Sequence, residues 1–204
     1  MITACYYSQS LDCIRILRTT HYTLFIILLI LFPKLGGNSG IGKVMVQELS
    51  RHGAHVISTA RSHDKCSQSI SDIKESLKVP DDSTLEKHKY GKVECLILDL
   101  ASFRSIEKFR NELKKRSKKV NGIILNAGIM MSPYSTTAEG FESQLGVNYI
   151  GHWYLINQLE QIIRNSKNMK NPLRIVTVAS NAHEGSYPEG TYLTYNPHTS
   201  TRVL

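Results

Sequence analysis

The sequence predicts an α/β protein built on a doubly wound parallel β-sheet. Segments with strand character alternate with segments of helical periodicity, and a glycine-rich turn immediately precedes the first of these helices. At 204 residues, of which 41% are hydrophobic, the chain is long enough to bury the core of one domain. The sequence shows no internal repeat, no low-complexity tract and no second-domain boundary, so we expect a single Rossmann-like sheet.

The elements follow in a regular order from the glycine turn onward. Apolar residues at helical spacing, closed by Gly53, predict the first helix. Ser102 is placed to cap a helix that carries Ile106, Phe109 and Leu113 on one face. Helices are predicted over 41–52, 64–78, the segment after Ser102, and 141–164. Strands are predicted over 54–60, 93–100, 122–126 and 174–179.

The first 35 residues form an atypical N-terminal segment that contains an apolar run over 24–32. One interpretation is the first, buried strand of the sheet, because a parallel strand covered on both faces is a continuous apolar tract. A second is a signal or membrane segment, although the run is shorter than the roughly 20 residues of a spanning helix. A third is sequence foreign to the domain. Pro33 disfavours a long central strand, since proline cannot donate to the ladder.

The net charge does not indicate one particular class of binding partner. The formal net charge of +8 comes from 25 Lys and Arg against 17 Asp and Glu, and much of the excess lies in 114–119, at the predicted end of a helix. Cations there complement the helix dipole and stay solvated. Because no aromatic residues are interleaved with this run, we expect no nucleic-acid partner. The basic charge and the apolar run leave membrane association open.

Cysteine and histidine spacing predicts neither metal binding nor secretion. The four cysteines form no C-x-x-C pair, and Cys95 lies within a strand pattern, which favours a buried reduced thiol in a reducing compartment. His52 and His55 are separated by a turn glycine and lack a third ligand, so no metal is expected. We therefore expect a cytoplasmic protein, or one on the cytosolic face of an intracellular membrane.

The glycine turn, residues 36–42, is suited to a dinucleotide. Gly36 permits a tight turn, Gly40 lets the backbone approach a pyrophosphate, and Gly42 lets the helix pack close to the sheet. Arg61 follows the second strand, where a cofactor without a 2′-phosphate would usually meet Asp or Glu. A guanidinium suits a bidentate grip on a 2′-phosphate, so NADP is favoured over NAD.

These motifs, together with later ones, resemble the short-chain dehydrogenase/reductase family, and more narrowly its retinol dehydrogenase branch. The resemblance is carried by residues 36–42, Thr59-Ala60-Arg61, Leu98-Asp99-Leu100, LNAGIMMSPYSTTAEGFESQLGVNYIGHW (125–153) and RIVTVASNAH (174–183). It covers roughly residues 36–185 and implies an NAD(P)-binding Rossmann domain over 36–204 that is truncated at its C-terminus. On this basis the later strands and helices of the family sheet are expected to be missing.

The resemblance also implies roles for individual residues. Phosphate contacts are expected from Gly36, Gly40 and Gly42. Contacts with the adenosine ribose and its 2′-phosphate are expected from Asn38, Ser39 and Arg61. Asp99 and Leu100 are expected beside the adenine, Ile41 near the nicotinamide, and Asn126, Ala127 and Gly128 beside the cofactor. Two residues are expected in the catalytic machinery: Asn148 holds the water of a proton relay, and Ser180 steadies the substrate oxygen.

The implied reaction is hydride transfer between a nicotinamide and a lipophilic alcohol or aldehyde. The family uses a Tyr-x-x-x-Lys pair as its general acid/base, and no such pair follows Ser180 in this sequence. General acid/base help is worth about 10² to 10⁴ in rate, so the chain as given is predicted to be inactive. The alternatives are a non-catalytic nucleotide-binding module and a membrane-associated interaction protein. A homodimer is expected only of a complete form, because the family pairs the helix over 141–164 with a later one.

Overall fold

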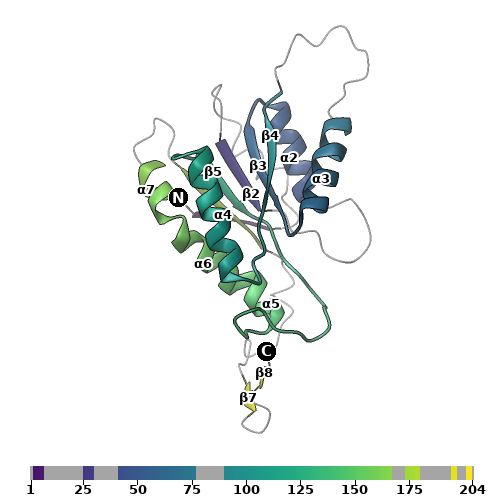
Figure 1. The fold of residues 1–204 in the computed structure, drawn as a ribbon, viewed down its shortest axis with the longest axis vertical. Coiled ribbons are helices and arrows are strands. Elements are labelled where there is room, and N and C mark those ends of the chain that lie inside the picture. Colours follow the sequence, from purple (N-terminus) through teal and green to yellow (C-terminus); the bar gives the residue numbers. More distant parts are fainter. Residues whose placement is uncertain are drawn as a thin grey trace.

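The computed structural model describes residues 2–6, 25–29, 41–76, 90–166, 173–179, 194–196 and 201–203. In this part of the chain, one sheet of six parallel strands has the order β1-β6-β5-β2-β3-β4 (Figure 1). Its strands are β1 (Ile2–Tyr6), β2 (Phe25–Leu29), β3 (His55–Ala60), β4 (Val93–Ile97), β5 (Gly122–Leu125) and β6 (Arg174–Ala179). A separate antiparallel pair joins β7 (Thr194–Asn196) to β8 (Thr201–Val203).

The sheet is doubly wound about β2, which lies within the apolar N-terminal run. Phe25 is in register with His55 of β3 on one side, and Ile26 is in register with Gly122 of β5 on the other. The chain therefore moves outward from β2 in both directions, which is the arrangement of a Rossmann-like fold. The predicted fold class is confirmed.

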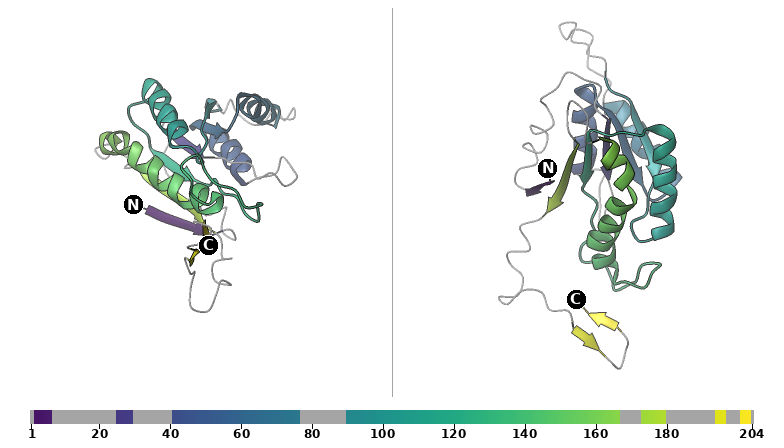
Figure 2. Two further views of the ribbon diagram at one scale, coloured as in Figure 1. Left: turned by 60° about the horizontal axis from the view of Figure 1, so that its bottom comes forward. Right: turned by 90° about the vertical axis from the view of Figure 1, so that its left-hand side faces the viewer.

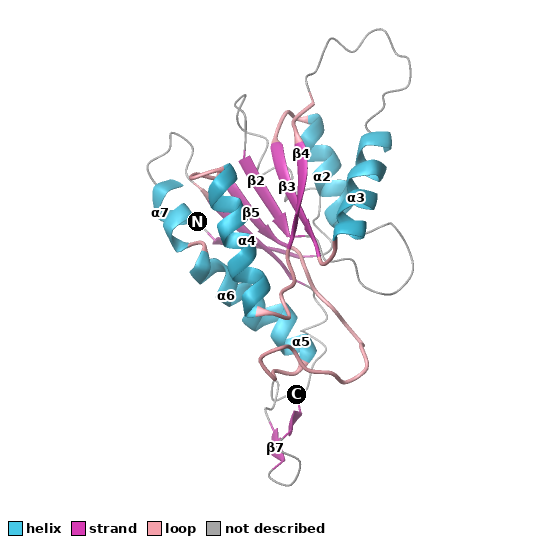
Figure 3. Ribbon diagram, viewed as in Figure 1, coloured by secondary structure: helices cyan, strands magenta, loops and turns pink. Residues whose placement is uncertain are grey.

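Helices cover both faces of the sheet (Figures 2 and 3). The helices are α2 (Ile41–Arg51), α3 (His63–Ser76), α4 (Phe103–Arg116), α5 (Ser143–Leu145), α6 (Gly151–Gln158) and α7 (Glu160–Ser166). Helices α2 and α3 lie on one face, while α4, α6 and α7 lie on the other (Figure 2). The layers are helix, sheet and helix.

Two apolar clusters, one on each face, hold these layers together. Adjacent strand residues point to opposite faces, so Val56 packs against α2 and α3 while Ile57 packs against α4. The same alternation separates Ile123 from Ile124 in β5. Strands β3 and β5 contribute to both clusters, and β5 (Gly122–Leu125) contains no polar side chain, whereas β3 also buries Ser58 and Thr59.

The predicted helix after Ser102 is observed as α4. The Ser102 hydroxyl accepts a hydrogen bond from the Ser105 N–H at 3.4 Å and so caps the first turn. Ile106, Phe109 and Leu113 are all buried against the sheet, as the helical spacing indicates. Lys114, Lys115 and Arg116 lie in the last turn.

The helical segment predicted over about 141–164 is observed over 143–166, but it is not one continuous α-helix. The helical stretch begins at Ser143, where the Glu142 carboxylate accepts hydrogen bonds from the N–H groups of Gln144 and Leu145, each at 2.9 Å. Its second part, η2 (Gly146–Ile150), is a π-helix. Wider turns of this kind are rare and concentrate at functional sites.

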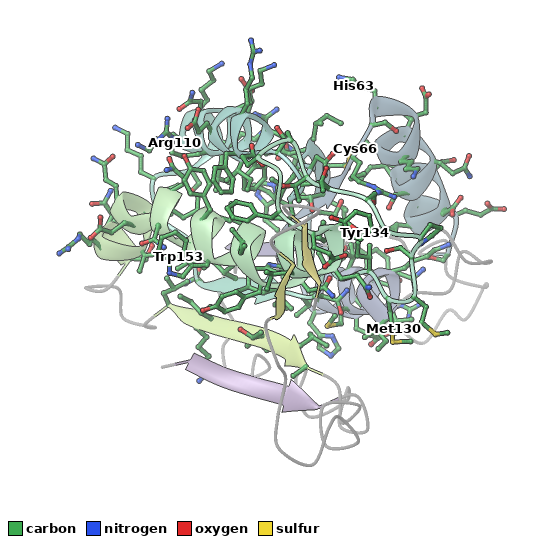
Figure 4. All side chains as sticks on the ribbon, turned by 90° about the horizontal axis from the view of Figure 1, so that it is seen from below. His63, Cys66, Arg110, Met130, Tyr134 and Trp153 are labelled. Atoms are coloured by element: carbon green, nitrogen blue, oxygen red, sulfur yellow. A yellow bond between two sulfur atoms is a disulfide. The ribbon has the colours of Figure 1, made fainter. Side chains whose placement is uncertain are left out.

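Cys95 is not the reduced thiol that its strand context predicted. It forms a disulfide with Cys66, whose Cα atom lies 5.5 Å away. Cys66 lies in the first turn of α3, near His63 (Figure 4), and Cys95 is the third residue of β4. The pairing escaped prediction because 29 residues separate the two positions and only the packing of α3 on the sheet brings them together. The expectation of a reducing compartment loses its support from Cys95.

Strand β1 was not predicted. It adds a sixth strand beside β6, with Ile2 in register with Ile175 and Tyr6 with Ala179. A five-residue segment without flanking turn signals gives too little periodicity to distinguish it from a loop. Among the described residues, no helix is long and apolar enough to cross a membrane.

Candidate functional site

The candidate site lies at the edge of the sheet where the parallel strands end. In an open parallel sheet, the loops beyond the carboxyl ends of the strands meet at one edge, and ligands bind there. Arg61 follows β3, Asp99 and Leu100 follow β4, and the Asn126–Gly128 segment follows β5. The structure therefore brings these sequence-predicted residues to one edge.

Helix α2 points its N-terminus toward this edge. It begins at Ile41, immediately after the predicted glycine turn, and carries no acidic residue in its first turn. Gly42 is buried in this first turn. The free N–H groups and the dipole at such a helix start favour an anion. Gly36, Asn38, Ser39 and Gly40 lie outside the described residues.

Arg61 occupies the first position after β3 and is partly buried. Ala60, which precedes it, is paired with Ile97 of β4 and accepts a hydrogen bond from the Leu98 N–H at 2.9 Å. The backbone that leads into Arg61 is thereby fixed to the neighbouring strand. Helix α3 begins two residues later, so Arg61 lies between the end of a strand and the start of a helix.

Asp99 and Leu100 form a tight turn that α4 and α6 hold in place. The Asp99 N–H donates to the Ser105 hydroxyl at 2.9 Å, and the Asp99 carboxylate accepts from the Ala101 N–H at 3.0 Å. Leu100 is buried and packs against Gly151, where an added Cβ would lie 2.5 Å from the Leu100 carbonyl oxygen. Only glycine permits this close approach of α6 to the turn.

Two side chains from η2 and α6 form hydrogen bonds with the backbone in and just after the Asn126–Gly128 segment. The Asn148 amide donates to the Ile129 carbonyl oxygen and accepts from the Ile129 N–H, both at 2.8 Å. Nε2 of His152 lies 2.8 Å from the Ala127 carbonyl oxygen. Burial lowers the pKa of the His152 imidazole, and the hydrogen bond to Ala127 only partly opposes this effect.

The catalytic half of the predicted site is described only in part. Asn148 lies in η2 and is exposed, although its amide is already bonded to the Ile129 backbone. Ser180 follows β6 directly in the sequence, but it lies outside the described residues. The relay and substrate-binding roles of these two residues remain predictions.

Two features of this edge were missed at the sequence level. His152 follows Asn148 by four residues, so both side chains share one face of the helical stretch, and this spacing was the available signal. The loop after Ile129 also exposes three large apolar side chains, Met130, Met131 and Tyr134, which are 68%, 81% and 61% exposed. Met130 and Tyr134 are labelled in Figure 4.

Metal chemistry finds no support in the part of the chain that the structure describes. No group of three His, Cys, Asp or Glu side chains there could hold a metal ion. Nδ1 of His52 lies 2.7 Å from the Glu48 carbonyl oxygen, and Nε2 of His55 lies 2.7 Å from Oε1 of Glu94.

Comparison with known proteins agrees with this arrangement. The human protein retinol dehydrogenase 13 is 38% identical over 148 residues, which are 72% of this chain and 40% of that protein. Human polyprenol dehydrogenase is also 38% identical over 148 residues, which are 72% of this chain and 42% of that protein. The chain thus spans about two-fifths of the length of these relatives.

A solved structure shows the same fold, and a family match identifies the chain. The RhlG/NADP complex of Pseudomonas aeruginosa superposes with a TM-score of 0.59 at 21% identity, covering 86% of this chain and 59% of that one. The sequence also matches the short chain dehydrogenase family over residues 34–195. The chain therefore belongs to the short-chain dehydrogenase family, in its retinol dehydrogenase-like branch.

Proposed function

We propose that this chain is the cofactor-binding part of an NADP(H)-dependent oxidoreductase that acts on lipophilic alcohols and aldehydes. The observation that carries the proposal is the gathering of Arg61, the Asp99 turn and the Asn126–Gly128 segment beside the N-terminus of α2. A dinucleotide needs an anion site for its phosphates and a surface for its rings, and this edge offers both.

Arg61 supports NADP over NAD as the cofactor. It is the first residue after the strand that neighbours β2, where the adenosine ribose of a dinucleotide is expected in this fold. A guanidinium there pairs with a 2′-phosphate through charge-assisted hydrogen bonds. It offers no acceptor to the free 2′-hydroxyl of NAD.

The lipophilic substrate class rests on the surroundings of the same edge. Met130, Met131 and Tyr134 expose apolar surface within five residues of Ile129. Met131 has a φ of 53°, which is unusual for a non-glycine residue, and its N–H donates to the Gln144 side chain at 3.1 Å. The two curated relatives are by name a retinol and a polyprenol dehydrogenase.

Replacing Arg61 by alanine tests the choice of cofactor. We expect NADPH affinity to fall by between about 10-fold and 100-fold, the value of charge-assisted hydrogen bonds, while NADH affinity changes little. Titration of nicotinamide fluorescence measures both dissociation constants. Arg51→Ala is the charge-matched control, because Arg51 ends α2 at the opposite edge of the sheet and pairs with Glu48. An equal loss for both cofactors would refute the 2′-phosphate role.

We further propose that the 204-residue chain binds NADPH without turning it over. No Tyr-x-x-x-Lys follows Ser180, so nothing in the sequence supplies the family's general acid/base. The purified chain with NADPH and retinaldehyde is expected to show no loss of the cofactor's absorbance above background. Robust reduction would contradict this expectation. Binding without turnover is also what a non-catalytic nucleotide-binding module would show.

We also propose a location and an oligomeric state. The location is the cytoplasm or the cytosolic face of an intracellular membrane, and a complete form of the enzyme is a homodimer. Membrane association is the expected consequence of a lipophilic substrate. Flotation of the chain with neutral and with anionic vesicles tests it, and failure to float with either would argue against it.

A further inference from the structure

His152 is a buried histidine with one partner. Its residue is 8% exposed, and Nε2 lies 2.8 Å from the Ala127 carbonyl oxygen. Nδ1 is buried and has no hydrogen-bond partner in the described structure. Since a carbonyl oxygen can only accept, Nε2 must carry the proton, and the neutral ring then presents Nδ1 as an unused acceptor.

The buried surroundings favour this single form of the ring. Protonating Nδ1 would place a donor and a positive charge in a site without a partner, which is costly in an apolar interior. Ala127 is itself only 8% exposed, so its carbonyl relies on the imidazole rather than on bulk water. The hydrogen bond is therefore specific in direction: the ring donates and the backbone of the segment accepts.

Asn148 and His152 act on the same short piece of backbone. Asn148 bonds both the N–H and the carbonyl of Ile129, and His152 bonds the carbonyl of Ala127. Gly128 lies between the two bonded residues, and a Cβ at Gly128 would stand 3.4 Å from Oδ1 of Asn148. Three hydrogen bonds from one helical stretch thus hold Ala127 and Ile129, the two residues that flank Gly128.

We propose that His152 is a positioning residue of the cofactor site, which with Asn148 clamps Ala127, Gly128 and Ile129 in the conformation that receives the dinucleotide. The inference rests on the proposed function, because it assigns the clamped segment to the cofactor. A histidine that merely filled the core would affect stability. A residue that clamps the segment must also affect the mobility of the segment and the affinity of the site for the dinucleotide.

Two variants of His152 separate these roles. His152→Phe keeps a flat ring but removes the donor, and we expect NADPH to bind about tenfold more weakly. His152→Gln retains an N–H donor and is expected to recover most of the affinity. Leu155→Ala is the matched control: Leu155 is fully buried one turn further along α6 and its side chain makes no hydrogen bond to the segment.

Three measurements decide the question. Nicotinamide fluorescence gives the dissociation constant, and amide hydrogen exchange of residues 126–131 gives the mobility of the segment without cofactor. Nitrogen-15 NMR of the wild-type imidazole shows which ring nitrogen carries the proton, and we expect Nε2 at neutral pH. Faster exchange and weaker binding in His152→Phe, but not in Leu155→Ala, support the clamp.

Two results would contradict the proposed clamp. A ring protonated on Nδ1, or a His152→Phe variant that binds and exchanges like Leu155→Ala, would overturn the proposal. If the wild-type chain binds no NADPH, the proposed function fails, and hydrogen exchange alone decides whether the clamp exists. Exchange of residues 126–131 that is unchanged by loss of the imidazole donor would then reject it.

Discussion

Removing the Cys66–Cys95 disulfide is expected to lower the free energy of unfolding by about 3 to 4 kcal/mol. The two cysteines are 29 positions apart, so the cross-link closes a long loop and restricts the unfolded chain. It also joins the first turn of α3 to β4, beside the loop that carries Arg61. The affected helix therefore borders the proposed 2′-phosphate site.

Urea unfolding followed by circular dichroism measures this loss. The wild-type chain is compared under oxidising and reducing conditions with the double variant Cys66→Ser, Cys95→Ser. Because the double variant has no cross-link at this site, a reductant should leave its unfolding midpoint unchanged. Mass spectrometry of a non-reduced digest checks that the 66–95 peptide pair is linked. A wild-type urea unfolding midpoint that is the same with and without the reductant would contradict the prediction.

Phe109→Ala is expected to cost about 3 to 5 kcal/mol of stability. Phe109 is 1% exposed and packs between α4 and the sheet, in the cluster that also contains Ile106 and Leu113. Its removal leaves a cavity that the surrounding strands cannot close, because β-sheet backbone is held by hydrogen bonds on both sides. The free energy of unfolding of a typical domain is about 5 to 15 kcal/mol, so this single change could remove most of the stability of the fold.

The control for this prediction is an aromatic residue outside the core. Tyr134 is 61% exposed in the loop after β5, and Tyr134→Ala should change the free energy of unfolding by no more than about 0.5 kcal/mol. Thermal and urea unfolding of both variants are compared with wild type. Similar losses in the two variants would show that α4 does not pack as described.

The sequence alone predicted the layers of the fold because hydrophobic periodicity is a local signal. Strand β6 was predicted with its observed bounds, and the helix after Ser102 was recognised from its cap and its apolar spacing. Arg61 was singled out by its position after a predicted strand, whereas Asp99, Leu100 and the Asn126–Gly128 segment were named from the family resemblance.

What escaped prediction depends on contacts between distant parts of the chain. The disulfide requires α3 to lie on β4, and the role of His152 requires α6 to lie over the end of β5. The four-residue spacing from Asn148 places His152 on the same helix face, but that spacing alone does not distinguish a core histidine from one that binds backbone. The π-helical turn around Asn148 was likewise not predicted, and the hydrogen bonds of Asn148 to Ile129 form only in the folded arrangement.

The pairing of β1 with β6 constrains when the sheet can be finished. Ile2 and Ile175 are partners in register, so β1 can be paired only after β6, which lies far along the chain, has been made. Contacts of such large sequence separation close late and slowly. Until then, one side of β6 offers an unpaired row of backbone groups that another chain could occupy. Strand β6 is thus most open to mispairing with another chain before β1 pairs with it.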